Sequence, residues 1–388
     1  MMDHSAIDAV LDAAPFPAFD DRIIAMFDAL HQKIMVHPKA RAFPDLAAFG
    51  FFVRARHLET IKQGYLADRT LLGRGLAFHI GPANVPLNFA YSLAASLLAG
   101  NPTIVRVSSK DFEQAGILVT LLNEALAQAD LPDVAAVIQY DHTSDYNQIL
   151  SKACDIRVVW GGDETIAFFK GIPTQPQATE IQFANRYSAL LIDAAFYLED
   201  CDPAETAQRV YNDIYPFEQQ ACTSPKLVFW LGNADACSAA KARFWPALAS
   251  LLTSPSYETK PGLGVRHFKS MAQMAAHHDV AEAGAHLHPN LKVLNLGEAA
   301  APVMPWSGSE GLFLQTDIED LSALGRHLDH RCQTLSVIGD VKDDILRTMA
   351  AQGMKGIDRI APVGSSSNFS FIWEGKDLIH AMSRSFPR

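Results

Sequence analysis

The sequence predicts an α/β fold in which parallel strands alternate with helices along a chain of 388 residues. Short apolar runs that suit buried strands recur between stretches whose apolar residues repeat at helical spacing. Several of these runs end in loops rich in glycine, proline or serine that lead directly into a helix, as strand–helix–strand units require. The length exceeds what one simple core usually holds, so we expect two domains.

The first half of the chain begins with a mainly helical stretch over residues 15–65 that prolines interrupt. A strand over 76–80 then leads through the loop 81–86 into a buried helix over 87–99, which ends at Gly100-Asn101-Pro102. Further strands are expected at 103–107, 134–140, 156–160 and 188–192. Helices are expected from the capping pair Ser108 and Ser109 to about residue 128, at 146–153 and from residue 164.

The same alternation restarts after Asp193. Helices are expected at 204–214, 236–252 and 268–283, and strands at 227–231, 291–296, 312–316 and 334–338. We therefore predict a cofactor-binding domain over 1–195, to which the tail at about 355–388 returns. A catalytic domain follows over 196–354.

The overall charge argues against two classes of partner. A formal net charge of −11 does not favour general affinity for nucleic acid or for an anionic membrane. The most apolar stretch, 89–100, is too short to span a bilayer. We therefore expect no nucleic-acid partner and no integral membrane association.

The cysteines and the N-terminus indicate a reducing, cytoplasmic setting. The five cysteines are odd in number and include no C-x-x-C pair, so neither a disulfide framework nor a zinc ribbon is favoured. Residues 1–5 lack the basic start and apolar core of a signal peptide.

Cys222 is the candidate nucleophile. It lies in Glu218-Gln219-Gln220-Ala221-Cys222-Thr223-Ser224-Pro225, a short polar loop that enters the apolar run 226–231. On such a loop the thiol can meet a substrate while its own backbone N–H is held beside the strand, where it can stabilise an oxyanion. A buried core cysteine is the alternative interpretation.

Asn84 is a candidate for the second oxyanion donor. Prolines on both sides of it, in Gly81-Pro82-Ala83-Asn84-Val85-Pro86, fix the backbone, so its side-chain amide is aimed at one place. The alternative is that Asn84 only caps the helix that follows.

Two further strand-end segments suit a nucleotide. Arg106 ends a strand and is followed by Ser108, Ser109 and Lys110; together they can hold a ribose or the 2′-phosphate of NADP. A solvated basic rim is the alternative there. The turn Gly161-Gly162-Asp163 allows close backbone approach at a helix start, although its acidic residue argues against a tight phosphate cradle.

Glu180 can serve as a general base or can be an ordinary surface carboxylate. His277, His278, His286 and His288 have no metal-site spacing, and we predict no metal.

Taken in order, these segments resemble the aldehyde dehydrogenase superfamily, and more closely the acyl-CoA reductase family typified by the fatty acid reductase subunit of bacterial bioluminescence systems. The segments that carry the resemblance are 84–92, 105–110, 160–165 and 220–225. Arg106 stands where the superfamily usually has a lysine. Glu180 is the nearest counterpart of the hydrolytic glutamate, whose usual E-L-G-G-K segment is replaced.

The resemblance implies an aldehyde dehydrogenase-like fold with a Rossmann-type cofactor domain and an α/β catalytic domain. It implies reduction of an acyl thioester such as acyl-CoA to the aldehyde, with an acyl-cysteine at Cys222. NADPH is the expected cofactor, with NADH as the alternative, at Pro82, Arg106, Ser108, Gly162 and Asp163.

Other activities stay open at this point. One is an oxidative aldehyde dehydrogenase that uses Glu180 as its base. Another is an acyl-accepting subunit that works with an acyltransferase or ligase partner. A homo-oligomer is compatible with each.

Overall fold

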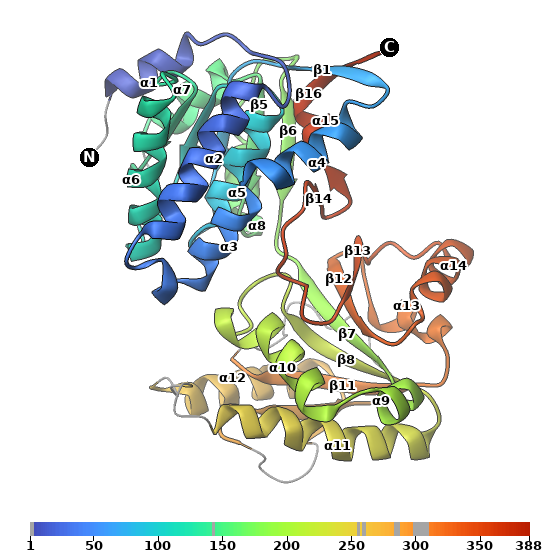
Figure 1. Ribbon diagram of the computed structural model, residues 1–388. Helices are drawn as coiled ribbons and strands as arrows, with labels where there is room; N and C mark the ends of the chain where they lie inside the picture. The colour runs from blue at the N-terminus through green and yellow to red at the C-terminus, as the bar shows by residue number, and fades with distance from the viewer. Residues whose placement is uncertain (1–3, 142–143, 254–256, 258–260, 283–287, 298–309) are drawn as a thin grey trace. The chain divides into compact units, whose positions relative to one another are not determined.

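The computed structural model describes the chain except residues 1–3, 142–143, 254–256, 258–260, 283–287 and 298–309 (Figure 1). The chain forms two compact units. The first consists of Met1–Ala184 and Phe369–Arg388, and the second of Asn185–Asn368. Each unit contains its own sheet with helices packed on it, which confirms the α/β prediction.

The first unit is built on a five-stranded parallel sheet in the order β4-β3-β2-β5-β6. Its strands are β2 (Ala77–Ile80), β3 (Thr103–Arg106), β4 (Ala135–Ile138), β5 (Ile156–Trp160) and β6 (Thr179–Phe183). The chain runs outward from β2 to β4 and then crosses to the other side of β2, so the strand order reverses between β2 and β5. Ligands of open α/β sheets bind outside the carboxyl ends of the strands at such a reversal.

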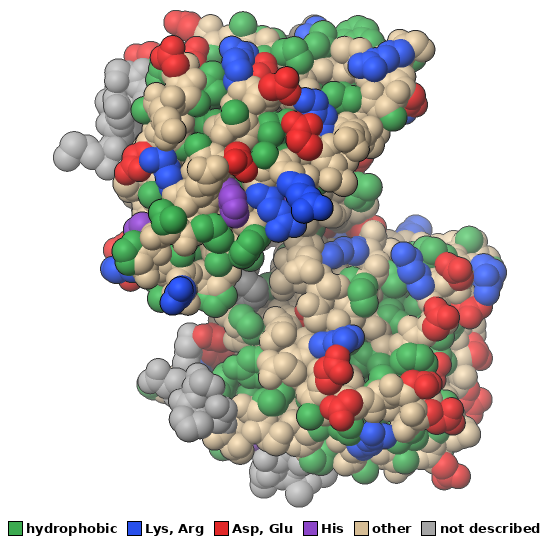
Figure 2. Space-filling model, viewed as in Figure 1, with side chains coloured by type: hydrophobic (Ala, Val, Ile, Leu, Met, Phe, Trp, Pro, Cys, Tyr) green, Lys and Arg blue, Asp and Glu red, His purple; other side chains and the backbone are tan. Residues whose placement is uncertain are grey.

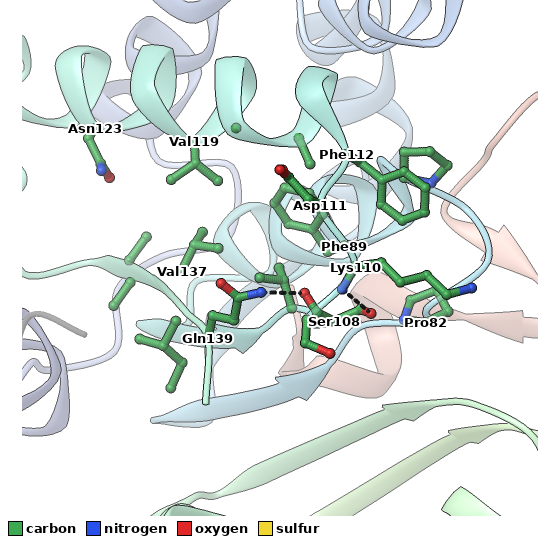
Figure 3. A pocket seen from close by; sticks show the side chains of 18 of the residues that line it. Pro82, Phe89, Ser108, Lys110, Asp111, Phe112, Val119, Asn123, Val137 and Gln139 are labelled. Atoms are coloured by element: carbon green, nitrogen blue, oxygen red, sulfur yellow. Dashed lines mark hydrogen bonds between the residues drawn. The ribbon is translucent and has the colours of Figure 1, made fainter. Parts of the chain in front are cut away.

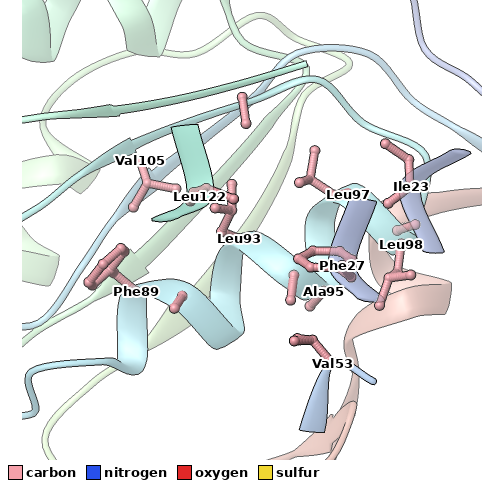
Figure 4. Packing of buried hydrophobic residues seen from close by; sticks show 14 of the residues in the cluster. Ile23, Phe27, Val53, Phe89, Leu93, Ala95, Leu97, Leu98, Val105 and Leu122 are labelled. Atoms are coloured by element: carbon pink, nitrogen blue, oxygen red, sulfur yellow. The ribbon is translucent and has the colours of Figure 1, made fainter. Parts of the chain in front are cut away.

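Two sets of helices cover the two faces of this sheet. Their bounds are α2 (Asp21–Val36), α5 (Asn88–Leu98) and α6 (Glu113–Gln128) for one face, and α1 (His4–Leu11), α7 (Tyr146–Ala153) and α8 (Asp163–Lys170) for the other. Successive side chains of a strand point to opposite faces, so Val105 packs with α5 and α6 while Ile104 packs with α1 and α7. Figure 4 shows Phe27, Leu93 and Leu122 in the core on the α2–α5–α6 face.

The rest of the first unit extends this core. Its elements are α3 (Pro44–Phe52), α4 (Ala55–Tyr65), β1 (Arg69–Gly73), β14 (Ile372–Trp373), β15 (Lys376–Asp377), α15 (Leu378–Met382) and β16 (Ser383–Pro387). The C-terminal strand β16 pairs antiparallel with β1, so the end of the chain belongs to the first unit.

The second unit is built on a seven-stranded sheet in the order β13-β12-β7-β8-β11-β10-β9, parallel except for β9. Its strands are β7 (Tyr187–Asp193), β8 (Pro225–Leu231), β9 (Val280–Glu282), β10 (Lys292–Leu296), β11 (Leu312–Ile318), β12 (Cys332–Ile338) and β13 (Arg359–Pro362). Its main helices are α9 (Ala194–Asp200), α10 (Pro203–Ile214), α11 (Ala234–Leu252), α12 (Leu263–His277) and α14 (Lys342–Gln352). Trp230 and Phe229 of the central strand β8 are fully buried on opposite faces.

Two segments differ from the sequence-based expectation. The strand expected at 188–192 is β7, which hydrogen-bonds to β8 and β12 and therefore lies in the second unit rather than with residues 1–195. The helix expected over 268–283 ends at His277, because residues 280–282 pair with β10 as strand β9.

Acidic and basic side chains are interspersed over the face of the molecule shown in Figure 2. Within the described parts of the chain, no helix combines the length and the apolar character needed to cross a bilayer.

Candidate functional site

Six predicted site residues lie at one edge of the first unit's sheet. The loop 81–87 follows β2, the loop 107–112 follows β3, and the turn 161–162 follows β5. Because these strands are parallel neighbours, their carboxyl ends share an edge. The residues brought together there are Pro82, Asn84, Arg106, Ser108, Gly162 and Asp163.

Asn84 is exposed in the loop between β2 and α5. The first residue of this loop, Gly81, is tightly packed. A Cβ added there would lie 3.1 Å from the Cβ of Phe89 and 3.3 Å from the carbonyl oxygen of Arg106. The N-cap residue of α5 is Leu87, whose side chain makes no cap hydrogen bond. Asn84 is therefore not the N-cap residue of α5, and it lies at the edge where ligands of parallel sheets bind.

Arg106 lies on the α1–α7–α8 face of the sheet. Its Nη2 donates to the carbonyl of Tyr140 at 3.4 Å, and its guanidinium lies 5.5 Å from the centre of the Tyr140 ring. Its Nε is buried and has no hydrogen-bond acceptor. A cation with one unsatisfied N–H at a strand end is a suitable partner for an anionic ligand.

Ser108 borders a cavity of about 850 Å³ on the opposite face, between α6 and β4 (Figure 3). Its hydroxyl accepts from the backbone N–H of Lys110 at 3.1 Å, and its carbonyl accepts from the side-chain amide of Gln139 at 2.9 Å. Pro82 lines the same cavity. The loop after β3 is therefore fixed in place, with Arg106 on one side of the sheet and Ser108 at the mouth of a groove on the other.

There is open space beside Gly162, in the turn between β5 and α8. A Cβ at Gly162 would meet no atom within 4 Å, whereas a Cβ at Gly161 would come within 2.7 Å of Thr165. Asp163 and Glu164 are exposed in the first turn of α8. Gly162 thus allows close approach of a ligand, while the two carboxylates oppose a phosphate at this helix start.

Glu180 does not join the other candidates. Its carboxylate pairs with the guanidinium of Arg157, whose side chain is only 1% exposed. Both residues are second in their strands, so Glu180 lies roughly 10 Å of strand length from the carboxyl edge. These contacts are those of a counter-ion to a buried arginine, and a role as general base stays a prediction.

Cys222 lies in the second unit, in the turn that leads into β8. The turn is closed by a hydrogen bond from the N–H of Ser224 to the carbonyl of Ala221 at 3.0 Å. The hydroxyl of Ser188 donates to the carbonyl of Cys222 at 2.6 Å. The residue is half-buried, and the backbone that carries its thiol is held from the neighbouring strand β7.

The other cysteines are less suited to attack a substrate. Burial raises the pKa of Cys154 and of Cys332 to about 12 and that of Cys237 to about 11. Cys201 is half-exposed, but burial raises the pKa of its thiol too. Because the thiolate is the reactive form, these raised pKa values make the four thiols poor nucleophiles.

Two residues beside Cys222 were missed by sequence reasoning. Gln219 is fully buried and has a left-handed backbone with φ 57°. Lys226 is the second residue of β8, and burial lowers its pKa to about 8, an effect that the charge of Cys222 opposes. The position of Lys226 four residues after Cys222 was a visible signal, whereas nothing in the sequence marked Gln219 as buried.

The predicted histidine cluster forms no described site. His277 ends α12, His278 and His288 follow it in described segments, and His286 lies outside the described residues. Among described residues there is no group of three or more His, Cys, Asp or Glu placed to hold a metal ion.

Comparison with known families gives a match for half of the chain. Residues 57–252 match the family model described as acyl-CoA reductase (LuxC). The long-chain acyl-protein thioester reductase of Aliivibrio fischeri is 29% identical over 163 residues, which are 41% of this chain and 33% of that protein. Long-chain acyl-protein thioester reductase 2 of Photobacterium leiognathi is 28% identical over 186 residues, 46% of this chain and 37% of that protein. The match thus spans about a third of the length of these relatives.

Solved structures share the fold along almost the whole chain. Aldehyde dehydrogenase 21 of Physcomitrella patens has a TM-score of 0.70 at 12% identity, covering 98% of this chain and 88% of that one. An NAD-dependent benzaldehyde dehydrogenase from Corynebacterium glutamicum has a TM-score of 0.64 at 12% identity, covering 98% and 86%. The aldehyde dehydrogenase-like fold is confirmed.

Proposed function

The chain belongs to the acyl-CoA reductase (LuxC) family, and from this premise we propose that it reduces an acyl thioester to the aldehyde through an acyl-cysteine at Cys222. The observation that carries the proposal is the fixed turn around Cys222, which combines a half-buried thiol with a carbonyl held by Ser188. A nucleophile on such a turn presents its own N–H beside the attacked carbonyl.

In the first step the Cys222 thiolate attacks the thioester carbonyl, and the carbonyl electron pair moves onto oxygen. The backbone N–H of Cys222 and the amide of Asn84 donate to this oxyanion. Collapse of the tetrahedral intermediate expels the thiolate of the donor, which takes up a proton. One thioester has replaced another, so the step is close to balanced in free energy.

The second step reduces the acyl group. A nicotinamide cofactor, when bound, supplies a hydride to the acyl carbon. Cys222 holds that carbon in place, and Asn84 again donates to the developing oxyanion. The thiohemiacetal then loses aldehyde and returns the Cys222 thiol. Neither step needs an activated water, which agrees with the engagement of Glu180 by Arg157.

The first unit offers groups that fit a nicotinamide nucleotide. The open space at Gly162 and the unsatisfied Nε of Arg106 flank the reversal of strand order at β2 and β5. Arg106 favours NADPH, because a guanidinium can pair bidentately with a 2′-phosphate. Arg106→Leu is therefore expected to raise KM for NADPH about 10-fold or more while changing KM for NADH little. Equal effects on the two cofactors would contradict the preference.

The substrate class follows from the relatives, which are named for long-chain acyl-protein thioesters. We assign to this chain a fatty acyl thioester, carried by coenzyme A or by a partner protein such as an acyltransferase or ligase subunit. The names of those relatives favour an acyl group that is bound to a protein, since they refer to acyl-protein thioesters.

The test is incubation of the purified chain with NADPH and acyl-CoAs of several lengths, following loss of NADPH absorbance and formation of aldehyde together. Cys222→Ala should abolish aldehyde formation, whereas Cys201→Ala, which removes the other half-exposed thiol, should leave it intact. Aldehyde formation by Cys222→Ala would overturn the assignment. Acylation of Cys222 without aldehyde would indicate the partner-dependent subunit, and oxidation of aldehydes with NADP⁺ alone would indicate the oxidative alternative.

A further inference from the structure

The cavity beside Ser108 is a groove with its charged lining residues at one end and uncharged side chains, Asn123 among them, along its length. At the polar end it meets the loop 81–87 through Pro82 and Pro86, the prolines on either side of Asn84. Lys110 and Asp111, the charged members of its lining, lie at this same end in the loop after β3. A ligand that fits this distribution has its polar group near Asn84 and an uncharged remainder.

The length of the groove is formed by one face of α6 and by β4. Ala115, Val119 and Leu126 recur at helical spacing along α6, and Val137 faces them from β4. Figure 3 shows Val119 and Asn123 of α6 across from Val137, with Pro82, Phe89 and Phe112 gathered at the other end. From Ala115 to Ala127 the helix is roughly 18 Å long, so the groove suits an extended chain.

The groove shares Pro82 and Ser108 with the expected nucleotide site, but its length extends away from that site. The strand order reverses between β2 and β5, whereas β4 is the edge strand beyond β3. Side chains alternate along β3, so Val107 lines the groove while Arg106 turns to the opposite face toward Tyr140. A cofactor held by Arg106 and Gly162 leaves the α6 face of the sheet open.

We propose that this groove binds the acyl chain of the thioester substrate, with the carbonyl at Asn84 and the chain running between α6 and β4. The proposal rests on the proposed reductase function, and it identifies the site that determines the preference for acyl chain length. The volume of about 850 Å³ is within the range of roughly 300–1,000 Å³ in which proteins bind small ligands of this size. Burial of the methylene groups against α6 and β4 favours long chains over short ones.

Gly116 offers a substitution that fills the groove without disturbing the fold. It lines the groove, and a Cβ there would meet no atom within 4 Å. Leucine is also a better helix former than glycine, so Gly116→Leu should not destabilise α6. Gly64 of α4 is the matched control, since it too is a helical glycine with open space around it but does not line the groove.

The experiment measures kcat/KM for butyryl-, octanoyl- and tetradecanoyl-CoA in the unsubstituted chain, Gly116→Leu, Ala127→Leu and Gly64→Leu. We expect Gly116→Leu to lower kcat/KM for tetradecanoyl-CoA about 10-fold or more while leaving butyryl-CoA unchanged. Ala127→Leu, at the far end, should affect the longest chain alone. Gly64→Leu should match the unsubstituted chain.

An unchanged chain-length profile in Gly116→Leu would overturn the proposal, as would a rise in KM for NADPH alone, which would place the nucleotide in the groove. If the unsubstituted chain forms no aldehyde from any acyl-CoA, the proposed function fails separately. The groove is then tested by binding of the fluorescent fatty acid cis-parinaric acid. Binding that Gly116→Leu weakens and Gly64→Leu does not would support the groove, and equal binding would overturn it.

Discussion

The side-chain amide of Gln219 donates to the carbonyl of Pro225 across 2.9 Å and thereby closes the loop that carries Cys222. The carbonyl oxygen of the same amide accepts from the backbone N–H of Gly311 at 3.1 Å. Glu218 and Gln219 both have left-handed backbones, which cost free energy unless the surroundings hold them. A single buried side chain therefore joins the cysteine loop to the segment that starts β11.

Gln219→Gly should lower kcat about 10- to 100-fold, because small displacements of a nucleophile have large effects on rate. Glycine tolerates the left-handed backbone, so the fall in kcat can be attributed to the loss of the Gln219 side-chain amide. The rate of alkylation of Cys222 by iodoacetamide, read by peptide mass spectrometry, should change in parallel. Glu218→Gly is the control, since it has the same backbone region and leaves the Gln219 amide in place. Equal effects of the two variants would contradict the positioning role.

Asn84→Ala should lower kcat about 100-fold or more if its amide donates to the oxyanion. Because Asn84 is exposed and is not the N-cap residue of α5, the thermal stability should change little. Both quantities are measured on one preparation, with Asn212→Ala of α10 as a surface control. A loss of stability with unchanged kcat would assign Asn84 a structural role instead.

Lys226→Met should slow alkylation of Cys222 at pH 7 by roughly 3- to 10-fold, because it removes a nearby positive charge that favours the thiolate. The assay uses the Cys201→Ala background so that one accessible thiol is followed. The difference in alkylation rate between the unsubstituted protein and Lys226→Met should shrink above pH 8, where the Lys226 amine loses its charge. A ratio of the two alkylation rates that stays constant from pH 6 to pH 10 would contradict a role for the Lys226 charge.

The same variant should be more stable than the unsubstituted chain at pH 7. Burial lowers the pKa of Lys226 from 10.5 to about 8, so between these values the unfolded chain holds a proton that the folded chain has lost. The contribution of Lys226 to stability therefore rises with pH across this window. The advantage of Lys226→Met in urea unfolding should be largest below pH 8 and should decline toward pH 10.

Glu180→Gln should lower the free energy of unfolding by about 1–3 kcal/mol, because it leaves the buried Arg157 guanidinium without its counter-ion. The value is less than for a fully buried pair, since the Glu180 side chain is 31% exposed. Aldehyde formation should keep its kcat. Glu205→Gln, which breaks an exposed pair with Arg209, is the control and should cost less than about 1 kcal/mol. A large fall in kcat without loss of stability would restore the base role.

The α/β class, most strands near their true bounds and the order of the strand-end segments could all be predicted from the sequence. These features are encoded locally: alternating apolar runs define strands, and proline and glycine after a strand define the loops at its carboxyl end. The prediction that Cys222 lies in a loop before a strand depended on eight consecutive residues, and the structure places it in the turn before β8.

Which of these residues lie close together depends on the three-dimensional arrangement of the strands. Strand order put β2 between β3 and β5, so the loops carrying Asn84, Ser108 and Gly162 share an edge while Glu180 faces Arg157 farther along the sheet. The groove along α6 and the closure of the Cys222 loop by Gln219 likewise join residues distant in sequence or buried by distant partners. Such contacts depend on how the strands pair and how the helices pack on the sheets. The periodicity of a short segment does not indicate which distant residues that segment will contact.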